Sequence, residues 1–190
     1  MVCYEGDIAT AKDRVEEGED PTVKDVDGRT PLHWACAGGK EDVVEWLMSL
    51  EGADVNTTDS GGWTPLLSAV AVGKVGIVED LLRGGADVKA KNDSGQTALH
   101  YHKGNASIAR ALIAGGAAKN AQDNRGETAM MRAASRGQLE VVRVLLENGA
   151  EIDLRNREGR TALAIACEAA AAGEAGAGEV AVLLAENGAD

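Results

Sequence analysis

Apolar residues in the stretch 123–153 follow the period of an α-helix and fall into two short blocks. In the second block, five aliphatic residues recur at helical spacing: Leu139, Val141, Val142, Leu145 and Leu146. The first block, residues 129–134, consists mostly of small residues and follows Thr128, whose side chain can cap a helix. Gly137 and Gly149 follow the two blocks, and glycine is the usual residue where a helix ends in left-handed backbone. The pattern predicts two short helices, each too small to bury its own apolar face.

The same order of capping threonine, small-residue block, glycine and aliphatic block recurs along the chain. A glycine stands two positions before each threonine, and the threonines are Thr30, Thr64, Thr97, Thr128 and Thr161. Their separations of 34, 33, 31 and 33 residues match the period of roughly 33 residues typical of ankyrin repeats, each a β-turn followed by two helices. Residues 30–35 carry the full Thr-Pro-Leu-His-x-Ala signature. We therefore expect an all-α ankyrin-repeat solenoid, built from helix-turn-helix repeats with short β-turn fingers.

Repeats of this kind contact only their neighbours, so we expect a single domain over residues 1–190. Residues 1–25 lack the threonine signature and are predicted to form a degenerate N-terminal repeat. The predicted full repeats are residues 26–59, 60–92, 93–123, 124–156 and 157–190.

Two repeats differ in length from the others. The third is the shortest, and its deletion falls at residues 101–105, so we expect its first helix to be clipped. The fifth contains an insertion rich in alanine and glycine at residues 168–178. We expect residues 169–172 to lengthen the first helix and the glycines after them to form a mobile loop. The role of the insertion stays open.

Composition and charge narrow the class of partner. The chain has no Phe and only 3% aromatic residues, which favours a core of Leu, Val, Ile and Ala with closely packed helices. A net charge of −12 disfavours binding to nucleic acid or anionic membranes.

Three cysteines, an odd number, with no signal peptide and no long apolar run, predict a soluble protein of the cytoplasm or nucleus, expected to be a monomer. Residues 1–27 hold nine acidic and three basic residues, interpreted as a solvated face.

The residues that could carry catalysis or bind a metal do not form a recognisable pattern. His33 and His100 occupy the same motif position and are interpreted as hydrogen-bonding struts between turns. Cys36 and Cys167 occupy corresponding small-residue positions and are interpreted as buried, inert thiols. His102 lies close to His100 but has no accompanying zinc-ligand spacing. We therefore expect no enzyme activity and no cofactor, with no catalytic, cofactor-binding or metal residues.

The turn tips and the exposed edges of the first helices remain free to bind a partner. These positions hold four acidic residues, Asp27, Asp93, Glu127 and Glu158, and seven basic ones: Arg29, Lys103, Arg125, Arg132, Arg136, Arg157 and Arg160. Trp63 is predicted on an exposed turn and is the kind of residue enriched in binding hot spots. These eight residues, the seven basic ones and Trp63, are the predicted partner-binding set, and they indicate a protein partner with an acidic, helical surface. The alternative is that polar turn tips carry this sign by accident of composition.

Several motifs, each in its own repeat, are similar to those of a narrower family. They are residues 29–36 (Arg-Thr-Pro-Leu-His-Trp-Ala-Cys), 62–66 (Gly-Trp-Thr-Pro-Leu), 99–101 (Leu-His-Tyr) and 128–134 (Thr-Ala-Met-Met-Arg-Ala-Ala). In this order they resemble the gankyrin family of non-ATPase subunits of the 26S proteasome, over most of residues 4–165. The resemblance implies a non-enzymatic chaperone for assembly of the regulatory particle, which binds the C-terminal domain of a base ATPase subunit through its concave face.

The same resemblance implies that Arg29 and Lys103 meet acidic residues of the ATPase. It does not carry over the family's Leu-x-Cys-x-Glu motif, because residues 165–169 read Ile-Ala-Cys-Glu-Ala. The sequence also ends at Asp190, before members of that family end. Two other classes stay open: a generic ankyrin-repeat adaptor with an unrelated protein partner, and a regulatory ankyrin segment of a larger enzyme.

Overall fold

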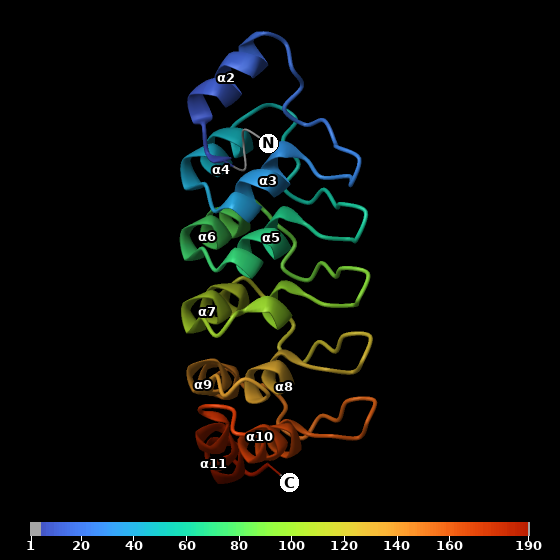
Figure 1. The fold of residues 1–190 in the computed structure, drawn as a ribbon, viewed down its shortest axis with the longest axis vertical. Helices are drawn as coiled ribbons and strands as arrows, with labels where there is room; N and C mark the ends of the chain where they lie inside the picture. The colour runs from blue at the N-terminus through green and yellow to red at the C-terminus, as the bar shows by residue number, and fades with distance from the viewer. Residues whose placement is uncertain (1–4, 190) are drawn as a thin grey trace. The chain divides into compact units, whose positions relative to one another are not determined.

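The computed structural model describes residues 5–189 and divides into two compact units, residues 1–93 (unit 1) and 94–190 (unit 2), which are treated separately below (Figure 1). The start of the predicted N-terminal repeat, with Cys3, and the final Asp190 lie outside the described residues. No strand occurs within residues 5–189, so the expectation of an all-α fold class is confirmed.

Unit 1 is built from short helices, each followed by a turn. In chain order they are α2 (Ile8–Glu16), α3 (Pro31–Gly38), α4 (Glu41–Met48), α5 (Pro65–Val72) and α6 (Val75–Arg83). Both α3 and α5 follow a capping threonine and begin with proline, whose fixed φ suits a first helical turn. Each ends at a left-handed glycine, with φ of 66° at Gly39 and 87° at Gly73. The sequence signals for helix start and stop therefore act at the predicted positions.

Unit 2 repeats this arrangement with altered first helices. Its elements are the 3₁₀ turn η1 (Ala98–Tyr101), α7 (Ala106–Ala114), α8 (Ala129–Ala134), α9 (Leu139–Glu147), α10 (Ala162–Ala171) and α11 (Ala177–Glu186). Each first helix packs on the next first helix, as α8 does on α10, and each second helix on the next second helix, as α7 does on α9. The fully buried residues at these contacts are small or aliphatic, such as Ala133, Ala166 and Val142. The short side chains allow close approach of the helices.

The third repeat is clipped as the sequence predicts. Its first helix is reduced to η1, and the chain reverses through Lys103 at φ 49°, the one non-glycine residue with positive φ within residues 5–189. His102 is completely buried, and it stands five residues after Thr97. The corresponding position holds Ala35 in the first full repeat and Ala133 in the fourth. A histidine therefore occupies a position at which other repeats bury an alanine.

The insertion in the fifth repeat is mostly helical. Residues 169–171 lengthen α10 as predicted, α11 begins at Ala177, and only residues 172–176 link the two helices. The linker packs against the turn between α8 and α9: a Cβ added at Gly137 would lie 2.7 Å from the backbone nitrogen of Ala177. The glycines after residue 172 are expected from the sequence to form a loop, but Gly178 lies within α11, and the remaining five-residue linker lies against the backbone at Gly137.

Replacing Gly137 by alanine should destabilise the protein by about 2–4 kcal/mol, because the new methyl group clashes with backbone as well as adopting positive φ. Gly173 provides the matched control, since its φ is 85° but a Cβ there would meet nothing within 4 Å. We expect Gly173→Ala to cost only about 1 kcal/mol. Urea unfolding followed by circular dichroism measures both. Equal destabilisation by the two substitutions would show that the linker does not pack on Gly137.

Candidate functional site

The β-turns before Thr30, Thr64, Thr128 and Thr161, here called fingers, are each closed by one Asp or Asn side chain at the base: Asp25, Asp59, Asp123 and Asn156. In unit 1, Oδ1 of Asp59 accepts hydrogen bonds from the backbone nitrogens of Gly61 and Trp63, both at 2.9 Å. In unit 2, Oδ1 of Asp123 accepts from the nitrogens of Arg125 at 2.8 Å and Glu127 at 3.0 Å. A single oxygen thus holds two backbone donors that would otherwise remain unpaired in the turn.

The second carboxylate oxygen of each of these aspartates bonds a cationic side chain. Oδ2 of Asp59 accepts from Nε of Arg29 at 3.0 Å, and Oδ2 of Asp123 accepts from Nη2 of Arg132 at 3.1 Å. Burial alone would raise the pKa of both carboxyl groups, but the backbone donors and the arginines outweigh it and leave each pKa below its usual range. Both aspartates are therefore charged at neutral pH, and each already neutralises one arginine.

In unit 1, Arg29 lies against the ring of Trp34 and shares Asp59 with the backbone of Trp63. The guanidinium carbon of Arg29 lies 5.0 Å from the ring centroid of Trp34, within the range of a cation–π contact. Trp63 is half-buried, and its carbonyl accepts a hydrogen bond from Nε2 of His33 at 2.9 Å. Arg29 and Trp63 are thus brought together through Asp59, and the Arg29 side chain remains 36% exposed.

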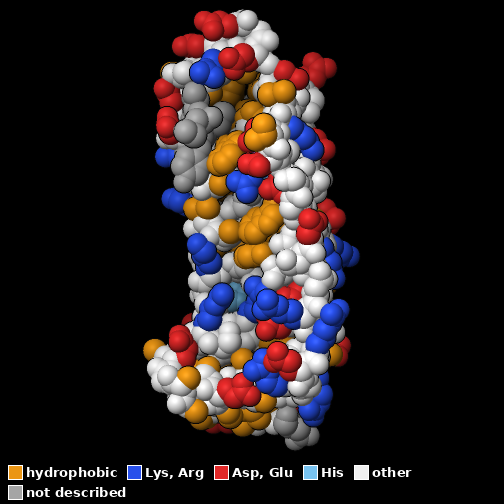
Figure 2. All heavy atoms as spheres, turned by 45° about the vertical axis from the view of Figure 1, so that its right-hand side comes forward, with side chains coloured by type: hydrophobic (Ala, Val, Ile, Leu, Met, Phe, Trp, Pro, Cys, Tyr) orange, Lys and Arg blue, Asp and Glu red, His pale blue; other side chains and the backbone are white. Residues whose placement is uncertain are grey.

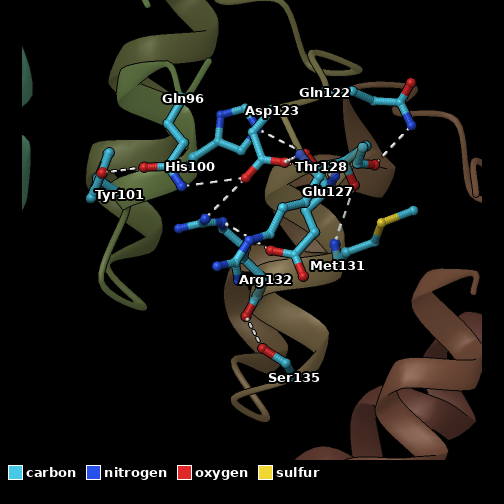
Figure 3. A network of polar contacts seen from close by, with 12 residues as sticks. Gln96, His100, Tyr101, Gln122, Asp123, Glu127, Thr128, Met131, Arg132 and Ser135 are labelled. Carbon is cyan, nitrogen blue, oxygen red and sulfur yellow. Dashed lines mark hydrogen bonds and ion pairs between the residues drawn. The ribbon is translucent and has the colours of Figure 1, made fainter. Parts of the chain in front are cut away.

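In unit 2 the corresponding network is centred on Arg132 (Figure 3). Its guanidinium pairs with Asp123 and with Glu127 at 3.5 Å, and it lies 5.9 Å from the ring of Tyr101. Gln96 extends the network, because its amide donates to Asp123 at 3.3 Å and its carbonyl oxygen accepts from the Tyr101 hydroxyl. The Arg132 side chain is only 16% exposed. Arg132 therefore joins η1, the finger and α8, and its charge is already compensated.

Arg160 is the third predicted binding residue that is paired within the chain. Asn156 stands at the base of its finger and has no carboxylate to offer, although its Oδ1 accepts from the nitrogens of Glu158 and Arg160 at 3.0 Å each. The guanidinium of Arg160 pairs instead with Glu158 and with Glu168 at 2.8 Å. The hydrogen bond to Glu168 raises the pKa of Arg160 further.

Four of the seven basic residues in the predicted binding set are exposed and have no carboxylate partner within residues 5–189. We call Lys103, Arg125, Arg136 and Arg157 the basic patch. Arg125 and Arg157 stand on neighbouring fingers joined by a backbone hydrogen bond of 3.0 Å from the nitrogen of Arg157 to the carbonyl of Arg125. Lys103 and Arg136 belong to the turns that end η1 and α8. Figure 2 shows lysine and arginine side chains gathered on the lower part of the visible face.

Comparison with known proteins identifies the family. The model for "Ankyrin repeats (3 copies)" matches residues 1–92, 71–156 and 102–190, which together span the chain. The chain belongs to the ankyrin-repeat family. It is also similar to a potassium channel, KOR1 of Oryza sativa subsp. japonica, with 44% identity over 46 residues. That segment is 24% of this chain and 5% of the channel, so the chain spans only a small part of this relative.

Ankyrin repeats are modules of protein–protein interaction. In this chain, His33 and His100 each hydrogen-bond the backbone of the next finger. Nδ1 of His33 accepts from the nitrogen of Thr30 at 3.2 Å, while Nε2 reaches the next finger at Trp63. His100 repeats this arrangement between Thr97 and the carbonyl of Glu127.

In residues 5–189 no group of three or more His, Cys, Asp or Glu is placed to hold a metal ion. Within the same residues, no helix is long and apolar enough to cross a membrane.

The two cysteines of the ankyrin signature positions differ in environment. Cys36 is fully buried, and burial raises the pKa of its thiol, so it is inert as predicted. Cys167 is exposed, and its interpretation as a buried thiol is wrong. The next first helix, α5, packs on α3 and covers Cys36, whereas no further helix pair within the described residues covers Cys167 on α10.

The sequence pattern singles out His102 only as a candidate metal ligand and does not predict its burial. It is fully buried, Nδ1 accepts from the nitrogen of Gly104 at 3.1 Å, and no described residue hydrogen-bonds Nε2 in good geometry. Burial, together with the smaller effect of the charges of Arg136 and Arg132, lowers the pKa of His102 to about 4. The signal in the sequence was the two-residue deletion, which moves a polar residue into a buried ankyrin position.

Arg132→Leu should destabilise the protein by about 3 kcal/mol, because it leaves the carboxylate of Asp123, only 1% exposed, without its cation. Arg136→Leu is the control, since Arg136 lies on the same segment but is exposed and outside any ion pair to a described residue. We expect that change to stay within about 0.5 kcal/mol. Free energies of unfolding of the two variants at neutral pH show whether Arg132 stabilises the fold while Arg136 does not. An unchanged free energy of unfolding in Arg132→Leu would mean that Asp123 keeps its charge without the arginine.

His102 should make stability fall in mild acid. Its pKa is lower in the folded chain than the usual 6.5, so its contribution is complete above pH 6.5 and is lost as pH falls toward 4. The loss should reach about 3 kcal/mol, and it should be absent from His102→Ala. His33, whose pKa burial also lowers, remains in both proteins and contributes with the same sign. Parallel stability curves of the two proteins between pH 7 and pH 4 would contradict this assignment.

Proposed function

We propose that this chain is a non-enzymatic interaction module whose basic patch binds an acidic, helical surface of a protein partner. The proposal is based on the difference between basic residues that are paired with a carboxylate of this chain and basic residues that are not. Arg29, Arg132 and Arg160 are paired within the chain, whereas the four residues of the basic patch have no carboxylate of their own in the described part. Exposed cations of this kind attract an acidic partner and set its orientation.

The candidate partner is the C-terminal domain of an ATPase subunit of the proteasome base, and the candidate role is that of an assembly chaperone in the cytoplasm or nucleus. The support is the resemblance of the motifs around Arg29, Trp63 and Lys103 to the gankyrin family. In unit 1, Arg29 offers a partner a pre-oriented group of its own, because Asp59 fixes its Nε and Trp34 fixes one face of its guanidinium. A carboxylate of the partner can bond the remaining nitrogens.

The double substitution Lys103→Glu/Arg136→Glu should weaken binding to the purified C-terminal domains of the base ATPases by roughly ten- to a hundred-fold, with a smaller effect at high salt. The matched control is Lys89→Glu/Arg110→Glu, which changes the net charge equally at two exposed positions outside the predicted binding set. Isothermal titration calorimetry against each ATPase domain measures the affinities.

Two outcomes would remove parts of the proposal. Binding of no base ATPase domain, together with salt-dependent binding of another acidic helical protein that the double substitution abolishes, would leave a generic ankyrin adaptor. Equal loss in the double variant and its control would show that the chain senses net charge and that the basic patch is not the binding site.

A further inference from the structure

Unit 1 contains a hollow where the chain between α2 and α3 crosses α4. The cavity measures about 150 Å³ and is lined by Ala11 and Val15 of α2, Pro21 and Val23 of the connecting chain, and Trp46 and Leu47 of α4. Figure 1 shows α2 and the connecting chain at the top of the ribbon, next to α4. The cavity is close in size to one that accommodates a benzene ring, so it can take one aliphatic or aromatic side chain.

The wall of this hollow is apolar and partly open to solvent. Ala11 and Leu47 form a floor that is 5% and 4% exposed, whereas Val23 at the edge is 60% exposed. Trp46 is half-buried, and the ammonium group of Lys12 lies 6.0 Å from the centroid of its ring. An exposed valine beside a half-buried tryptophan presents the apolar contact area that protein partners use.

The rim of the hollow is acidic. Glu16, Glu17, Glu19 and Asp20 are all exposed, and the last two line the cavity. Arg14 offsets part of this charge through an ion pair with Glu19 at 3.6 Å, and Lys12 adds a second cation beside Trp46. The hydroxyl and backbone nitrogen of Thr22 lower the pKa of Asp20, so this carboxylate stays ionised at neutral pH. A partner for this rim must be positively charged.

We propose that this hollow docks a basic segment of a second protein partner, which inserts one aliphatic side chain against Trp46 and Leu47 while its lysines or arginines face the acidic rim. The site has the opposite sign to the basic patch and lies in the other unit, so it extends the proposed function: the chain binds an acidic partner through unit 2 and a basic one through unit 1.

The test uses the full chain and a fluorescent peptide in which one leucine is flanked on both sides by lysines. Val23→Ser should weaken binding about ten-fold, because it removes apolar contact at the edge of the wall without adding a charge. Val182→Ser is the matched control, since Val182 is 58% exposed on α11 in unit 2. Both valines are exposed, so neither change should unfold the chain, and circular dichroism checks this.

The charge requirement is tested separately. Glu19→Gln/Asp20→Asn should weaken binding of the peptide roughly three- to ten-fold at low salt, while keeping the turn, because asparagine can accept the Thr22 hydrogen bonds. Glu79→Gln/Glu147→Gln removes two exposed carboxylates elsewhere and should have little effect. The Lys103→Glu/Arg136→Glu variant should bind this peptide as wild type does, so failure of the basic-patch proposal and failure of this one are distinguishable.

Four results would overturn the proposal. The first is no binding of the peptide at all, and the second is binding that survives Val23→Ser. The third is equal affinity for a peptide in which glycine replaces the leucine, which would mean attraction to the acidic surface without insertion. The fourth is a molecular mass that rises with protein concentration and returns to that of a monomer in Val23→Ser, which would assign the hollow to a second copy of this chain.

Discussion

The carboxylate at the base of a finger, provided by Asp25, Asp59 and Asp123, is the contact on which the candidate site depends. One oxygen accepts from two backbone nitrogens and gives the turn its shape, and the other oxygen accepts from an arginine or an indole group. Asp25 shows that the second position is not reserved for arginine, because its Oδ2 accepts from the indole nitrogen of Trp34 at 2.8 Å. The same carboxylate therefore sets both the backbone of a finger and the orientation of a side chain on the binding face.

This double use explains why the basic residues separate into two groups. An arginine within reach of a finger carboxylate becomes part of the structure, as Arg29 and Arg132 do. Lys103, Arg125, Arg136 and Arg157 stand on turn tips or helix ends beyond that reach, and their charge remains directed to solvent. Counting charges along the sequence treats the two groups alike, whereas only the second retains a full charge for a partner.

The repeat, its helix boundaries and the clipped third helix could be predicted from the sequence, because each depends on local signals: a capping threonine, proline in the first turn, a glycine at the end. The pairing of Arg132 with Asp123 could not, since it depends on which rotamers converge between a finger and its own helix. The exposure of Cys167 also escaped prediction. Its position in the motif is that of a buried residue, and burial there requires a neighbour that the motif itself does not supply.

The contact between Gly137 and the linker after α10 has a consequence for how the fifth repeat can vary. Gly137 ends a helix turn with φ of 60°, so glycine is favoured there even without an insertion next door. The longer α10–α11 connection uses the space left by that absent side chain and needs no compensating change on the fourth repeat. The dependence runs in one direction: losing the insertion leaves Gly137 unaffected, whereas replacing Gly137 while the insertion is present destabilises the protein. Sequence drift at residue 137 is thus restricted by a segment almost forty residues downstream.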